Sequence, residues 1–215
     1  MKIRNFILAA LAISFSFFVT EAQGATKEEK KALTEKVVKQ CRKDAKKMEK
    51  EGWKIIPGKL PLERQLERSQ LAQLKTTDKG ESFYFIGSAN VKGGNYTIAK
   101  QMADNNAKAE IVRNISEAIA SKMTQEFANL DLGEDEMEMH NEFIAATKAV
   151  ASLTLQGVEY LTEIYREVSN GVVEAQVVVA VPQEKAYQSA KEVIKSELKA
   201  KSSQYLKDLD KVLPY

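Results

Sequence analysis

Apolar residues recur at helical spacing along much of the chain. In residues 26–51 apolar positions lie three or four residues apart within a lysine- and glutamate-rich background. A longer stretch, about 96–129, carries two rows spaced by four: Ile111, Ile115, Ile119, Met123 and Phe127, and Ala99, Ala103 and Ala107. A 3.6-residue period places each row on one face of a helix. The alanine row predicts a face that can approach a sheet closely.

Three further helices are indicated by helix-start residues and by periodicity. Pro61 suits the first turn of a helix with a thin leucine stripe. Another helix is predicted over about 136–152, and a third begins after Pro182. Residues 82–86 are rich in strand formers and end at Gly87, which predicts a strand. Residues 53–56 are predicted to form a short extended piece.

The clearest local pattern is a β-hairpin around Asn170-Gly171, a dipeptide that favours a type I′ turn. Pairing across that turn matches residues whose numbers sum to 341, and the predicted pairs are Val168 with Val173, Ile164 with Val177, Thr162 with Val179, and Tyr160 with Val181. These residues would form the buried face of the hairpin. The opposite, wet face would carry Glu159, Glu163, Glu167 and Glu174. We also expect this ribbon to lie beneath the alanine-bearing helix.

These elements predict an α+β fold, in which a small antiparallel sheet of three or four strands is covered on one face by long amphipathic helices. The simplest partition has a signal peptide at 1–22, an N-terminal helical extension at 23–80 and an α+β domain at 81–215.

The first residues have the pattern of an export signal. Lys2 and Arg4 precede the apolar run 6–19, which is short for a membrane-spanning helix and suited to a signal sequence. Cleavage is expected after Ala22 or Gly24. No second run of that length follows, so we expect no transmembrane segment in the mature chain. Cys41 lies too far along the chain to carry a lipid.

The composition argues against several classes of function and of site. Lysine and arginine number 32 against 30 acidic residues, which argues against a nucleic-acid binder. One cysteine and one histidine exclude a disulfide framework within the chain and sites built from several of either residue. Cys41 on the first apolar stripe is interpreted as a buried apolar residue, with an intermolecular disulfide as the alternative. Trp53 is interpreted as core rather than as a platform for stacking a sugar. No cofactor is expected.

Two motifs are weighed as ligand sites. Residues 87–94 follow a strand and precede a helix, where phosphate loops occur, but no lysine stands at the helix start. We interpret them as a turn, with anion binding by helix-start N–H groups as the alternative. The acidic run at 134–142 surrounds His140, and pairs spaced by four in it would supply two metal ligands, fewer than zinc usually takes. We interpret the run as a solvated helix start.

No catalytic motif is present. A Gly-x-Ser-x-Gly elbow is absent, and His140 lies in a polar stretch. A pair of carboxylates for glycan hydrolysis stays possible on composition alone, since spacing in sequence does not fix their separation in space. No catalytic, binding or metal residue is therefore assigned.

The stretch 83–122 resembles a family of envelope proteins. Its Tyr84-Phe85-Ile86-Gly87-Ser88-Ala89 segment and the alanine and isoleucine periodicity that follows, with the later hairpin, are similar to the Lpp-twenty family of bacterial envelope lipoproteins. The amino-terminal domain of the flagellar assembly protein T is similar too. Residues 49–54 and 57–63 look like uncharacterised exported proteins of Bacteroidetes-type bacteria. The resemblance covers about 44–210 and implies a small α+β envelope domain without known enzymatic activity. The lipid-carrying cysteine of the lipoproteins is missing.

The sequence therefore leads to the hypothesis of an exported, non-catalytic protein of the bacterial periplasm or cell envelope that acts by binding or assembly. Its partner would be an unknown envelope protein or polymer, and a homo-oligomer is possible. One alternative is a carboxylate-dependent hydrolase of an envelope glycan or peptide. Another is peripheral membrane attachment through the lysine-rich first helix.

Overall fold

The part of the chain that the structure describes forms five α-helices, a short 3-10 helix and four strands. The computed structural model describes residues 27–128, 134–152, 155–169, 171–198 and 209. The elements in chain order are α1 (Lys27–Lys50), β1 (Lys54–Ile55), α2 (Leu62–Leu74), β2 (Tyr84–Gly93), α3 (Tyr96–Ala128), α4 (Glu134–Thr147), η1 (Lys148–Ser152), β3 (Glu159–Ser169), β4 (Val172–Pro182) and α5 (Gln183–Leu198). The predicted α+β class is confirmed, and the predicted signal peptide lies outside the described residues.

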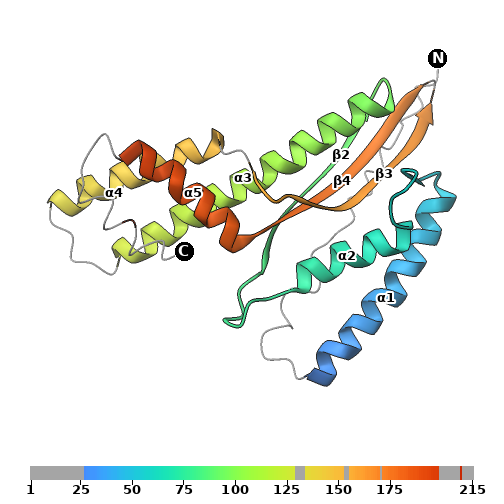
Figure 1. The fold of residues 1–215 in the computed structure, drawn as a ribbon, viewed down its shortest axis with the longest axis horizontal. Helices are drawn as coiled ribbons and strands as arrows, with labels where there is room; N and C mark the ends of the chain where they lie inside the picture. Colours follow the sequence, from blue (N-terminus) through green and yellow to red (C-terminus); the bar gives the residue numbers. More distant parts are fainter. Residues whose placement is uncertain (1–26, 129–133, 153–154, 170, 199–208, 210–215) are drawn as a thin grey trace, which may run out of the picture.

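The four strands form one antiparallel sheet in the order β1-β3-β4-β2. Helix α3 runs alongside β2 and continues beyond the sheet, where α4 and α5 pack against its second half (Figure 1). Helices α1 and α2 lie together on the other side of the sheet (Figure 1). The sheet is therefore covered on both faces, whereas the sequence led us to expect cover on one face only.

The main core lies between α3 and the sheet. The three alanines of the predicted row are completely buried there, together with Val177 and Val179 of β4. Two β2 glycines allow this close approach: a Cβ on Gly87 would overlap the carbonyl oxygen of Ala107, and one on Gly93 would lie 2.9 Å from the Cα of Ala99. The prediction that the hairpin valines are buried beneath an alanine-bearing helix is confirmed for those of β4, Val173, Val177, Val179 and Val181. It is wrong for Val168, which is 42% exposed.

The second face has smaller clusters with polar groups among them. Trp53 packs with residues of α1 and with Ile164, and Ala72 of α2 packs on β4. The Ser69 and Thr162 hydroxyl oxygens lie 2.7 Å apart in a buried hydrogen bond. Because alternate residues of a strand point to opposite faces, the valines and alanines of β4 divide between the two cores. From Val177 to Val181 this strand is apolar on both faces, as is typical of a strand covered on both sides.

The predicted hairpin register is wrong over most of its length. Ser169 pairs with Val172 as expected, but the register shifts between Glu167 and Ser169, so that Glu163 pairs with Val177. A second shift follows between Tyr160 and Thr162. Each shift is a bulge, and one extra residue moves the side chains that follow to the other face. Gly171 has a φ of +82°, whereas Asn170 lies outside the described residues.

The segment interpreted as a glycine-rich turn is strand. Strand β2 does not end at Gly87 but continues to Gly93, paired residue by residue with β4. The helix that follows is capped by Asn95, whose side-chain oxygen accepts the N–H of Ile98 at 3.0 Å. The interpretation as a turn is therefore wrong for residues 87–93, and the alternative of anion binding by helix-start N–H groups stays a prediction.

The helix predictions hold, with different ends. The helix expected at 136–152 ends at Thr147 and continues as the 3-10 turn η1, while Pro61 precedes the first residue of α2. Within the described ranges, no helix combines the length and hydropathy that crossing a bilayer requires.

Candidate functional site

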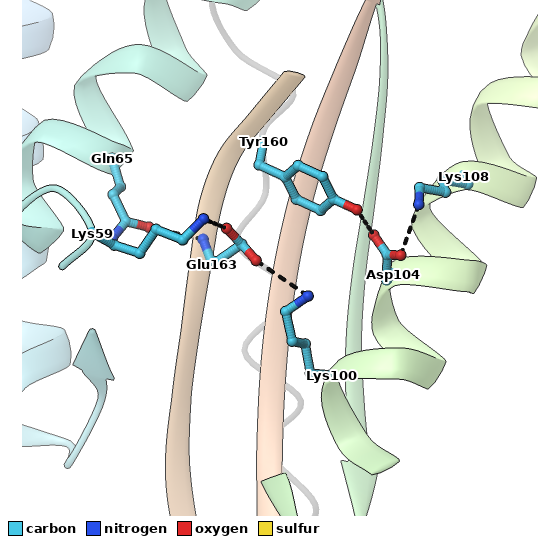
Figure 2. A network of polar contacts seen from close by, with 7 residues as sticks. All are labelled: Lys59, Gln65, Lys100, Asp104, Lys108, Tyr160 and Glu163. Atoms are coloured by element: carbon cyan, nitrogen blue, oxygen red, sulfur yellow. Dashed lines mark hydrogen bonds and ion pairs between the residues drawn. The ribbon is translucent and has the colours of Figure 1, made fainter. Parts of the chain in front are cut away.

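A polar network lies on the α3 side of β3, where α3 itself packs on β2 and β4 (Figure 2). At its centre the carboxylate of Glu163 is buried, with 7% of its side chain exposed. Its two oxygens contact the ammonium groups of Lys59 at 2.6 Å and Lys100 at 3.3 Å. Lys59 precedes α2 and Lys100 belongs to α3, so one carboxylate joins two distant segments across β3.

A second half of the network is centred on Asp104 of α3. Its carboxylate accepts hydrogen bonds from the Tyr160 hydroxyl at 2.6 Å and from the Lys108 ammonium group at 2.8 Å. Burial alone would raise the pKa of the Asp104 carboxyl group, but these two bonds outweigh burial and lower the pKa below its ordinary value of 3.8. The same pairing raises the pKa of Lys108.

Three ammonium groups surround the ring of Tyr160. The Nζ atoms of Lys59, Lys100 and Lys108 lie 6.0, 5.5 and 5.6 Å from its centroid, within cation–π range. Three lysines and two carboxylates leave this network with a formal charge of +1 (3 − 2). Each ammonium group carries three N–H donors. Their number, and the surplus of positive charge, suit the network to an anionic group next to an aromatic surface.

More aromatic surface adjoins the network. The rings of Tyr96 on α3 and Tyr165 on β3 lie 4.9 Å apart between centroids. Burial, the nearby Glu163 carboxylate and Tyr165 raise the pKa of Tyr96, so its phenol stays neutral at physiological pH. The half-buried rings and the lysines therefore form one surface, over which apolar, hydrogen-bonding and cationic groups alternate.

The network also closes one edge of the sheet. Strand β1 pairs with only two residues of β3, Ile164 and Tyr165. Beyond them the N–H of Glu163 donates to the side-chain oxygen of Gln65 at 2.8 Å, and the Gln65 amide donates to the Leu60 carbonyl at 2.7 Å. The glutamine side chain thereby takes the place of the next residue of an edge strand.

The four glutamates expected on one wet face do not share a face. Because of the bulges, Glu163 lies on the α3 side, whereas Glu174 lies on the side of α1 and α2. Glu174 is buried and paired with Arg166 at 2.7 Å, and the Arg166 guanidinium lies over the Trp53 ring. Glu167 is exposed, in an ion pair with Lys54. The expectation of a wet glutamate face is therefore wrong for Glu163 and Glu174.

Two other residues singled out in the sequence are buried. Trp53 belongs to the core, as interpreted. Cys41 is a free, buried thiol, and burial, followed by the charges of Asp44 and Glu67, raises its pKa to about 11. The His140 side chain and most of the acidic run lie outside the described side chains. Among the described residues, no group of three or more histidines, cysteines and acids is placed to hold a metal ion.

Sequence reasoning assigned no binding residue and so missed this network. One pattern in the sequence marks half of it. Lys100, Asp104 and Lys108 each follow an alanine of the buried row, so they form a parallel row on the flank of α3 that faces β3. The contacts of Lys59 and Gln65 with β3 link residues about a hundred positions apart, and no local pattern indicates them.

Comparisons of this chain with protein-family models, with curated proteins and with solved structures found no match. The resemblance to envelope lipoproteins therefore stays a prediction from the sequence.

Proposed function

We propose that this protein is exported to the bacterial cell envelope and acts there by binding or assembly, without catalysis. The observation that carries the proposal is the network around Tyr160, with three lysines about one ring and a surplus of positive charge. Its partner would present negative charge, as a carboxylate- or phosphate-bearing envelope polymer or an acidic protein surface does. The sequence pattern of an export signal supports the location.

The state of the acids favours binding over hydrolysis. Hydrolysis of a glycan by two carboxylates needs a general acid whose pKa is raised. The pKa of Asp104 is lowered instead, and Glu163 is held between two ammonium groups. Asp104 is thus arranged to stay ionised, and both carboxylates orient lysines, a role that suits recognition of an anion.

The contacts of α1 argue against its use as a membrane anchor. Cys41, Ala45 and Met48 of its apolar stripe are buried in the contact with α2 and its surroundings. Insertion of an amphipathic helix into a lipid surface requires an apolar face that is free to be buried there. In residues 41–48 that face is already used by the fold.

Sedimentation with insoluble envelope material tests the proposal. The purified protein should co-sediment at low salt and be released as salt increases, because screening weakens contacts between exposed charges. A triple variant removes the Glu163 carboxylate together with the two ammonium groups that it contacts: Lys59→Gln, Lys100→Gln and Glu163→Gln. No buried charge is therefore left unpaired. We expect this variant to fold and to bind at least about tenfold more weakly.

The control is the exposed ion pair of Lys54 on β1 and Glu167, which lies near the other end of β3 from Tyr160. Its double glutamine variant should bind as the wild type does. Equal binding by the triple variant would contradict the role of the network. Release of soluble fragments from the envelope polymer by wild-type protein would contradict a non-catalytic function.

A further inference from the structure

We propose that the free edge of β2 binds an extended segment of another protein, which adds a fifth strand to the sheet. Strand β2 is last in the strand order, and within the described ranges it pairs only with β4. In an antiparallel ladder, the N–H and C=O groups of alternate residues point away from the partner strand. This surface is separate from the lysine–tyrosine network, and the inference does not depend on the function proposed for that network.

Two hydrogen bonds establish which residues point outward. The Phe83 carbonyl accepts the N–H of Gln183 just after β4, so odd-numbered residues of β2 face β4. The N–H of Ser88 donates to the Glu110 carboxylate on α3 at 2.6 Å, so even-numbered residues face outward. Among the described residues, the outward N–H groups of Asn90 and Lys92 have no hydrogen-bond partner. The section from Asn90 to Lys92 is therefore an open edge.

An apolar flank accompanies this edge. Ile98, Met102 and Glu110 belong to one row of α3 with a spacing of four, and such a row lies along one side of a helix. Since Glu110 reaches the outward N–H of Ser88, the row lies on the free-edge side of α3. Ile98 and Met102 are 46% and 47% exposed. A strand added to β2 would place alternate side chains beneath these two residues.

The positive charge of Lys92 favours an acidic residue in the added strand. Lys92 lies opposite Glu174 in the ladder, but the Glu174 carboxylate is paired with Arg166. Among the described residues, Lys92 has no ion pair. Its side chain points to the face opposite α3, because even-numbered residues of β2 share that face with Ile86. The segment that fits is thus apolar at the positions beneath α3 and polar or acidic at the others.

A second copy of this chain fits the edge less well than an acidic segment does. Pairing of two copies would place β2 beside β2, and Tyr84–Gly93 contains no aspartate or glutamate that could pair with Lys92. We therefore infer that the added strand comes from another protein.

The probe is a short capped peptide in which valine alternates with threonine and glutamate, titrated into the isotope-labelled protein and followed by NMR. We expect saturable shifts of the backbone amides at positions 88–92 and of the Met102 methyl group. Asn90→Pro removes one outward N–H from a strand position where proline is tolerated, and should weaken binding at least about tenfold. Asn90→Ala keeps the N–H and should bind as wild type does.

A peptide of the same composition, with N-methyl groups on the residues that would face β2, is the second control and should not bind. Thermal unfolding of both Asn90 variants verifies that they fold. Absence of saturable shifts at 88–92, or equal affinity of the proline and alanine variants, would overturn the proposal. So would sedimentation velocity that shows a dimer broken by Asn90→Pro, because the occupant would then be a second copy.

Discussion

The two edges of the sheet are closed to different degrees. At the β3 edge, strand β1 pairs with two residues and the side chain of Gln65 accepts the next N–H, that of Glu163. At the β2 edge, the described residues bond just one outward N–H, that of Ser88, which donates to Glu110. An edge strand with unpaired backbone groups tends to pair with other chains, and proteins usually cover or interrupt it. One edge is therefore covered by the fold, whereas the other keeps backbone groups that can pair with an added strand.

The largest effect is expected where α3 sits on the open edge strand. Gly87→Ala would place a Cβ against the Ala107 carbonyl and 2.9 Å from the Ile111 side chain. Because the first contact is with backbone, α3 must shift, and we expect a loss of about 3 kcal/mol of unfolding free energy in chemical denaturation. Gly94→Ala is the control, since no atom lies within 4 Å of its added Cβ. Equal stability of the two variants would show that α3 is not seated on β2 as described.

Opening the closed edge should lower the unfolding free energy by less than Gly87→Ala does. Gln65→Leu keeps the volume of the side chain but leaves the buried N–H of Glu163 without its acceptor. An unsatisfied buried donor costs about 1–3 kcal/mol, and denaturant unfolding monitored by Trp53 fluorescence measures the loss. Gln65→Glu, which retains an acceptor oxygen, serves as the comparison. If the leucine variant were as stable as the wild type, the glutamine would have no role in closing the edge.

The network beside the closed edge should make stability depend on pH. The folded-state pKa of Asp104 is lowered from 3.8, so its contribution to stability is present above that value and is lost as pH falls below it. Asp104→Asn should lower the melting temperature near pH 7. Between about pH 5 and pH 3 the melting temperature of this variant should fall by less than that of the wild type. An equal fall in melting temperature for the two proteins over this pH range would contradict the lowered pKa of Asp104.

The smallest change in stability is expected at Glu110. Its hydrogen bond to Ser88 is exposed, so Glu110→Ala should change the unfolding free energy by less than about 0.5 kcal/mol. The exchange rate of the Ser88 amide should nevertheless rise by about tenfold, because the acceptor of its N–H is removed. An unchanged Ser88 exchange rate would mean that some other group covers this part of the edge.

Local patterns in the sequence predicted the helices and strands, but not the register and contacts between them. The alanine row of α3 and the valines of β4 indicated the main core, because period and residue size are local properties. The register failed at the bulge between Glu167 and Ser169, because no residue there distinguishes a bulge from a regular turn. The cover on the second face depends on α2 packing against β3, a contact between segments distant in sequence. For the same reason the contacts of Lys59 and Gln65 with Glu163 were not predictable.

Amide hydrogen exchange along β2 tests the account most directly. NMR would resolve the rates of four consecutive residues, Ala89, Asn90, Val91 and Lys92. We predict alternation: slow exchange at Ala89 and Val91, whose N–H groups face β4, and fast exchange at Asn90 and Lys92, whose N–H groups face outward. The amide of Glu163 at the closed edge should exchange slowly. Equal protection of all four β2 amides would contradict an open edge, and with it the proposed docking of an extended segment.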